Sequence, residues 1–103
     1  MIYNKKWVID FYTTSNNVNP IYNHLITLPI KDKARIINDI ELLKDYETNL
    51  GLNKQRKISG RRYKGLWELR IRFGTNFYRI LYFLHIRSTF VLLHCFQKKS
   101  KKN

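Results

Sequence analysis

The strongest constraint on the fold is a pair of apolar runs joined by a very short turn near the carboxyl end. Residues 66–73 form one run, in which apolar and charged side chains alternate from Trp67 onward. This alternation is typical of a strand that turns one face to a core. Gly74-Thr75-Asn76 is a tight turn, and residues 77–84 form a second apolar run. So short a connection predicts that the two strands pair antiparallel. A second turn at residues 85–88 leads into a further strand over 89–96.

The amino-terminal part predicts one strand and two helices. Residues 7–12 are β-branched and aromatic, which indicates a first strand. Asn19-Pro20 is typical of a helix start, with Asn as the cap and Pro in the first turn. This helix is expected to run to about Leu28, where Pro29 separates it from a longer one.

The longer helix is expected to end near Gly51 and to bury one apolar stripe. The stripe comprises the apolar residues at spacings of three and four, namely Ile30, Ala34, Ile37, Ile40 and Leu43. The acidic residues of this helix are interpreted as part of its solvated surface.

These elements predict a single α+β domain over residues 1–103 with the order β-α-α-β-β-β. Two helices are expected to pack on one face of a four-stranded, mainly antiparallel sheet. The last strand is placed inside the sheet because residues 90–93 are apolar on both faces. Residues 51–65 are interpreted as a basic connector.

Basic residues are concentrated in the second half. The first 53 residues contain six Lys or Arg and six Asp or Glu, whereas the remaining 50 contain fourteen Lys or Arg and Glu68 alone. The net charge of +13 therefore resides in the second half. A surplus gathered in this way indicates a polyanionic partner, most often nucleic acid.

Other function classes find little support. No apolar run is long enough for a membrane span, and no signal peptide is evident, so a cytoplasmic protein is expected. Cys95 is the only cysteine and is expected in the core. Three scattered histidines lack the spacing of a metal site, so neither metal nor cofactor is expected.

Arginines on strand positions are the first candidate site residues. Arg70 and Arg72 lie on the polar face of their strand, although a solvated face is an equally good interpretation. Arg79 interrupts an apolar strand, so it must reach solvent, pair with an acid or bind a ligand. Glu68 can neutralise at most one arginine. We expect an exposed Arg79 whose removal abolishes activity without unfolding the chain.

Histidines and tyrosines give weaker signals. His94 could act as a general base, but a partly buried, hydrogen-bonded histidine is the preferred interpretation. Tyr63, Tyr78 and Tyr82 could stack on bases, and at least two of them are expected in the core.

Three blocks of this half resemble the phage-derived HigB-like toxins of the RelE superfamily. The blocks are Gly65-Leu66-Trp67-Glu68-Leu69-Arg70, Tyr78-Arg79-Ile80-Leu81-Tyr82 and Leu92-Leu93-His94-Cys95-Phe96-Gln97-Lys98-Lys99. Leu28-Pro29 followed by an Ile-rich helix, and the Gly51 loop, fit the same pattern. The resemblance spans nearly the whole chain, and the ordered set is more specific than any block alone.

The resemblance implies the RelE-like fold and a toxin that cleaves messenger RNA on the ribosome. It implies catalytic roles for Arg79, which would contact the scissile phosphate, for Arg70, and for Lys98 or Lys99. It leaves the general base open, with His94 as a weak candidate. It also implies a HigA-like helix-turn-helix antitoxin as partner, with operator DNA bound only by the toxin–antitoxin complex.

Further basic residues are predicted to bind RNA, namely Lys57, Arg61, Arg62, Lys64, Arg72, Lys101 and Lys102. A non-catalytic, ribosome-associated RNA-binding module is the main alternative, because it accounts equally well for the charge and the aromatic residues. A DNA-binding regulator is less favoured, since the longer helix carries too many acids for a recognition helix.

Overall fold

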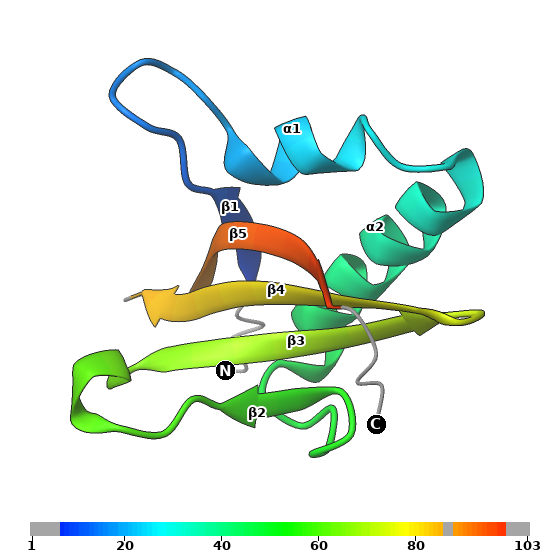
Figure 1. The fold of residues 1–103 in the computed structure, drawn as a ribbon. Helices are drawn as coiled ribbons and strands as arrows, with labels where there is room; N and C mark the ends of the chain where they lie inside the picture. Colours follow the sequence, from blue (N-terminus) through cyan, green and yellow to red (C-terminus); the bar gives the residue numbers. More distant parts are fainter. Residues whose placement is uncertain (1–6, 86–87, 99–103) are drawn as a thin grey trace, which may run out of the picture.

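In the computed structural model, which describes residues 7–85 and 88–98, two helices pack on a mixed sheet of five strands (Figure 1). The chain forms β1 (Val8–Phe11), α1 (Pro20–Leu25), α2 (Ile30–Tyr46), β2 (Gln55–Lys57), a 3-10 turn (Arg61–Tyr63), β3 (Leu66–Phe73), β4 (Asn76–His85) and β5 (Thr89–Lys98). The sheet order is β1-β5-β4-β3-β2, with β1 parallel to β5 and the other neighbours antiparallel.

The predicted α+β class and the order of the six main elements are confirmed, but the predicted strand count is wrong. The expected connector over residues 51–65 contains β2, which pairs with β3 at the sheet edge. Its sequence Gln55-Arg56-Lys57 has no apolar alternation, so periodicity could not reveal it. Gln55 anchors it instead, donating 2.7 Å hydrogen bonds to the Glu47 carbonyl and the Tyr82 hydroxyl.

The hairpin of β3 and β4 and the start of α1 are confirmed, but the turn of the hairpin is one residue shorter than the predicted Gly74-Thr75-Asn76. Phe73 pairs with Asn76, so the turn consists of Gly74 and Thr75. Gly74 has φ 61°, which a glycine adopts without steric cost. At α1, the Asn19 side chain accepts the Tyr22 N–H at 3.0 Å.

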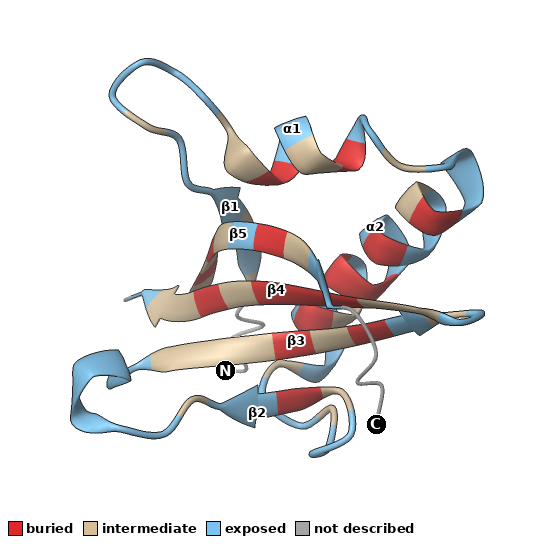
Figure 2. Cartoon of the chain, in the orientation of Figure 1, coloured by how far each residue is buried: buried red, intermediate tan, exposed pale blue. Residues whose placement is uncertain are grey.

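The core lies between the helices and one face of the sheet (Figure 2). Tyr78, Ile80 and Tyr82 of β4 alternate inward and are almost completely buried. Cys95 is buried beside them, and burial raises the pKa of its thiol to about 12. The core placement expected for Cys95 and for two of the three tyrosines is confirmed.

Helix α2 buries Ile40 and Leu43 of the predicted stripe but not the amino-terminal part of that stripe. Ile30 is 84% exposed and Ile37 44% exposed, whereas Ile36 is fully buried. Asp32 and Asp39 are buried as well, so their interpretation as solvated residues is wrong.

Specific partners offset the cost of burying these two carboxylates. Asp32 accepts hydrogen bonds from the Tyr78 hydroxyl and, at 2.9 Å, from Asn76. Asp39 lies 2.7 Å from the Lys54 ammonium and 3.4 Å from Arg35. The helix is thereby rotated relative to its apolar stripe, and Ile30 and Ile37 remain in solvent.

No helix in the described part of the chain is long and apolar enough to cross a membrane. Within residues 7–85 and 88–98, no three His, Cys, Asp or Glu side chains gather as potential metal ligands.

Candidate nucleic-acid interface

The outward face of β3, β4 and β5, opposite the core face, carries the charged positions of these strands. Directly paired residues of neighbouring strands share a face of the sheet. Arg70 pairs with Arg79, and Phe77 pairs with both Arg72 and Lys98. The register therefore brings four of the predicted site cations onto one face.

Glu68 joins two of these cations. Its Oε2 lies 3.5 Å from Nε of Arg79, and its Oε1 lies 3.6 Å from Nε of Arg70. Nη1 of Arg79 also lies 3.3 Å from the Tyr78 carbonyl oxygen. One carboxylate thus holds two guanidinium groups side by side.

Arg79 is only 6% exposed, so the expectation of an exposed arginine is wrong. Its neighbours cover it, and pairing with Glu68 makes that burial tolerable. Arg70 keeps 30% of its side chain exposed. Since one acid faces two arginines, a net positive charge remains.

The electrostatics of Arg79 reflect this crowding. Burial lowers the pKa of its guanidinium, the Glu68 carboxylate raises it, and the positive charges of Arg70 and Arg56 lower it. An incoming anion would relieve the repulsion among these cations. The cluster therefore carries positive charge that the single carboxylate of Glu68 does not neutralise.

A pocket of about 340 Å³ opens at this cluster. Its walls are Asn53, Arg70, Ile71, Arg72, Phe77 and Arg79. The Arg72 guanidinium lies over the Phe77 ring, 5.3 Å from its centroid. The pocket thus combines arginine donors with an aromatic wall, the combination that binds phosphate and base together.

Helix α2 supports the pocket from behind. The Lys54 ammonium is held by the buried Asp39, and the Lys54 carbonyl accepts the Arg70 N–H at 2.7 Å. A carboxylate in the core thereby fixes the backbone beside one of the site arginines. Sequence reasoning missed this link because it placed Asp39 in solvent.

The carboxyl-terminal lysines are only partly described. Lys98 ends β5 and is exposed, opposite Phe77 on the same face as Arg79. Lys99, Lys101 and Lys102 lie outside the described residues.

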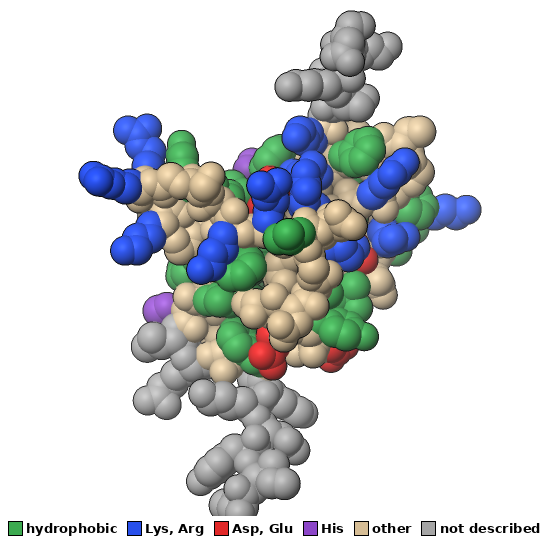
Figure 3. All heavy atoms as spheres, turned by 90° about the horizontal axis from the view of Figure 1, so that it is seen from below, with side chains coloured by type: hydrophobic (Ala, Val, Ile, Leu, Met, Phe, Trp, Pro, Cys, Tyr) green, Lys and Arg blue, Asp and Glu red, His purple; other side chains and the backbone are tan. Residues whose placement is uncertain are grey.

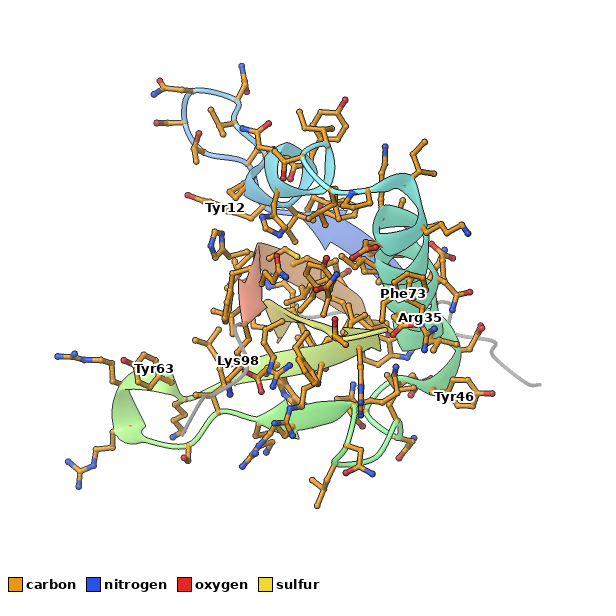
Figure 4. All side chains as sticks on the ribbon, turned by 45° about the vertical axis from the view of Figure 1, so that its right-hand side comes forward. Tyr12, Arg35, Tyr46, Tyr63, Phe73 and Lys98 are labelled. Atoms are coloured by element: carbon orange, nitrogen blue, oxygen red, sulfur yellow. The ribbon has the colours of Figure 1, made fainter. Side chains whose placement is uncertain are left out.

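A second basic group projects from the body of the sheet. It consists of the exposed residues Lys57, Arg61, Arg62 and Lys64, in and around the 3-10 turn. Tyr63, 45% exposed, stands away from the sheet on this turn (Figure 4). We call residues 57–65 the basic lobe. Lys57 begins it, with its ammonium 5.7 Å from the Trp67 ring centroid.

Seen from the β2 side, Lys and Arg side chains extend over the lobe and across one half of the molecule, with little acid among them (Figure 3). The pocket and the lobe both lie in the half of the sequence that carries the surplus charge. The predicted basic residues that the structure describes therefore form two groups.

His94 is exposed, so its interpretation as a partly buried, hydrogen-bonded residue is wrong. It lies on β5 opposite Leu81, with its ring 6.1 Å from Phe96. No hydrogen bond of His94 is found within the described residues.

Two further residues belong to this surface and were not predicted. Arg56 pairs with Glu68 across β2 and β3, and Asn53 lines the pocket. Arg56 could be recognised in the sequence as one of the basic residues of the 51–65 segment. Its position beside Glu68 could not be predicted without recognising β2.

The arrangement can bind a phosphodiester and stabilise charge on its oxygens, because planar guanidinium groups donate to two oxygens at once. Glu68, 21% exposed, and His94 can also accept protons.

Residues 23–103 match the family model described as "Phage derived protein Gp49-like (DUF891)". The match begins within α1 and covers β2 to β5, including the pocket and the basic lobe. No curated protein matches the chain.

Proposed function

The chain belongs to the Gp49-like family of phage-derived proteins, a member of the RelE/ParE-like toxin superfamily, and from this premise we propose that it is a HigB-type toxin that cleaves messenger RNA on the ribosome. The observation that carries the proposal is the environment of Arg79. Its side chain lies on the sheet face opposite the core, is only 6% exposed, and is joined to Arg70 through the Glu68 carboxylate. Two arginines that pair directly across neighbouring strands repel each other and do not stabilise a sheet. Their presence therefore favours an anionic ligand for this face.

In the proposed reaction the RNA supplies its own nucleophile. The 2′-hydroxyl oxygen attacks the neighbouring phosphorus, the bond to the 5′ oxygen breaks, and a 2′,3′-cyclic phosphate and a 5′-hydroxyl result. Arg79 and Arg70, with Lys98 or Lys99, stabilise the charge that develops on the phosphoryl oxygens, commonly the largest catalytic contribution.

The proton of the 2′-hydroxyl needs an acceptor. We assign this role to Glu68, because its carboxylate contacts both arginines that would hold the phosphate. The departing 5′ oxygen takes a proton from solvent. His94 is the alternative acceptor, and Glu68→Gln and His94→Gln distinguish the two.

The partners follow from the same proposal. The ribosome and its messenger RNA are the substrate complex, and the basic lobe with Arg72, Lys101 and Lys102 contributes to RNA binding. A HigA-like helix-turn-helix antitoxin holds the toxin inactive, and operator DNA is bound by the complex of the two. These partners place the protein in the cytoplasm.

Induced expression in a bacterial host tests the proposal. We expect arrested growth and translation, with recovery when the cognate antitoxin is co-expressed. Arg79→Lys should abolish the arrest, because lysine keeps the charge but lacks the planar guanidinium group that donates to two phosphate oxygens at once. Arg35→Lys, on α2, is the matched control and should remain toxic. Undisturbed growth with abundant folded wild-type protein would contradict the proposal.

A non-catalytic RNA-binding module is the second candidate, favoured by the basic lobe with its exposed Tyr63. Such a module would bind ribosomal RNA and leave messenger RNA intact. Intact messenger RNA on ribosomes saturated with wild-type protein would favour this alternative.

A further inference from the structure

Trp67 lies near the start of β3, beside the basic lobe and on the opposite face of the sheet from Arg79. It pairs with Lys57 of β2 and with Tyr82 of β4, so these three side chains share the core face. Its indole ring stacks with the ring of the buried Tyr82, with the centroids 6.3 Å apart and the planes 21° from parallel. Trp67 itself stays partly exposed, so the core supports an aromatic ring that solvent can still reach.

Two hollows meet at Trp67. One, of about 420 Å³, is lined by Lys57 and Lys64 of the basic lobe together with apolar side chains. The other, of about 450 Å³, lies beside the loop after α2 and is lined by Arg56 and Lys57. No acidic side chain of the described residues lines either hollow. Figure 3 shows apolar side chains exposed among Lys and Arg on this side of the molecule. Such a surface suits a ligand that combines a flat apolar part with negative charge.

The cations at this ring are in position without a ligand. The Lys57 ammonium lies 5.7 Å from the indole centroid, the geometry of a cation–π contact. A 3.0 Å hydrogen bond from the Ile58 N–H to the Leu66 carbonyl closes the lobe. Lys57 and Lys64, on either side of this closure, are thereby kept at the same hollow. Positioning of this kind lowers the cost of ordering side chains on binding.

We propose that Trp67 and the two lysines form a second nucleotide subsite, in which an unpaired base of RNA stacks on the indole ring and its phosphate binds Lys57 and Lys64. The base takes the place of the Lys57 ammonium over the ring, and the ammonium moves to the phosphate that arrives with the base. Aromatic rings beside cationic side chains bind single-stranded RNA in this way, with little dependence on sequence.

Arg56 links this subsite to the arginine pair. It belongs to β2, the last strand of the sheet on this side among the described residues, and it lines the hollow beside Trp67. It also pairs with Glu68 on the opposite face, and its positive charge lowers the pKa of Arg79. One RNA strand can therefore pass from the arginine pair over the β2 edge to Trp67. The inference rests on the RNA binding of the proposed function, but not on cleavage.

The fluorescence of Trp67 reports stacking of a base directly. The chain has two tryptophans, and Trp7→Phe removes the other one while keeping an aromatic ring against Phe90. The probe is a labelled ten-nucleotide 2′-O-methyl oligouridylate, which offers no 2′-hydroxyl for cleavage. We expect it to quench the fluorescence of Trp67 in the full chain, with the same midpoint as the rise in its own anisotropy. An abasic chain of equal length should bind more weakly and cause no quenching.

Variants of the ring and of one lysine test the two contacts separately. Trp67→Leu should weaken binding of the oligouridylate by about tenfold, whereas Trp67→Phe keeps a ring and should recover most of the affinity. Lys57→Met should weaken binding by about fivefold and lower the salt dependence by about one phosphate contact. Lys31→Met, at an exposed position of α2, is the matched control and should change binding less than about twofold. Circular dichroism establishes that each variant is folded, and Lys57→Met carries the test if Trp67→Leu is not.

The proposal is overturned if the oligouridylate binds without quenching Trp67, or if the abasic chain quenches it equally. It is also overturned if no binding occurs at millimolar concentration. Equal quenching by a ten-residue polyglutamate would show that the hollow takes an acidic protein segment instead. Arg79→Lys should leave the quenching unchanged, and loss of quenching in that variant would refute a separate subsite. Quenching by the oligouridylate without cleavage on programmed ribosomes would support this inference and contradict the proposed function alone.

Discussion

Glu68→Gln separates phosphate binding from chemistry at the arginine pair. The substitution keeps the size of the side chain and removes the carboxylate that lies 3.5 Å from Arg79 and 3.6 Å from Arg70. We expect the variant to bind RNA more tightly and to cleave it more slowly. A general loss of structure would weaken both, so the combination is specific to the proposed site.

The magnitude follows from the geometry. A phosphate on the far side of the guanidinium groups would lie roughly 7–8 Å from the Glu68 carboxylate, a repulsion of about 2 kcal/mol at an effective dielectric constant of ~20. Because Glu68 is 21% exposed, solvent and salt reduce this to about 1 kcal/mol, or roughly fivefold tighter binding. Loss of a general base lowers cleavage by about 100-fold or more.

The same substitution should cost stability. Arg70 and Arg79 are directly paired across β3 and β4, and without Glu68 they face each other with no counter-charge. We expect a loss of about 1–2 kcal/mol. For a chain of this size the melting temperature would fall by roughly 5–15 °C.

Fluorescence anisotropy with a short single-stranded RNA measures binding, and primer extension on programmed ribosomes measures cleavage. Glu41→Gln removes the same charge from α2 and should alter RNA binding less than about twofold. The reasoning is refuted if Glu68→Gln binds RNA no more tightly than Glu41→Gln does, or if it cleaves at the wild-type rate.

Three further outcomes are expected. Arg79→Lys should reduce cleavage on programmed ribosomes by about 100-fold while RNA binding falls much less, since one charge is kept; equal losses in both would point to a binding role alone. Tyr78→Phe should cost about 1–3 kcal/mol in urea unfolding, because the buried Asp32 loses a donor, and an unchanged midpoint would contradict that contact. Burial and the charge of His94 lower the pKa of His24, so folding stability should fall as the pH drops below about 6.5, and His24→Gln should flatten this part of the pH profile.

The hairpin could be predicted because both of its signals are local. The alternation over residues 66–73 and the glycine turn involve neighbours in sequence, and the strand bounds agree closely with the structure. The register depended on one residue of the turn. A turn of three residues would pair Phe73 with Phe77, whereas the two-residue turn pairs it with Asn76 and places Arg70 opposite Arg79.

The rotation of α2 could not be predicted because the partners of its buried acids are distant in sequence. A periodic pattern assigns Asp32 and Asp39 to solvent unless their donors are known. Those donors, Tyr78 and Lys54, lie in a strand and a loop far along the chain. The burial of Arg79 escaped prediction because its contact with Glu68 depends on the register of β3 and β4.

The candidate site was predicted in composition but not in arrangement. The arginines on β3 and β4 were identified, and the sheet brings them together. The role of Glu68 as a bridge required knowledge of side-chain geometry. The separation of the basic lobe from the pocket depended on β2, whose three polar residues form a strand only because the edge of β3 accepts them.

Cleavage of a modified messenger RNA tests the central claim most directly. Ribosomes carrying messenger RNA are incubated with the wild-type chain, and the cut position is then replaced by its 2′-deoxy form in a second message. Nucleophilic attack by the 2′-hydroxyl predicts cleavage of the first message alone, with a 5′-hydroxyl on the downstream fragment. Cleavage of the deoxy message, or a 5′-phosphate on the downstream fragment, would contradict the mechanism.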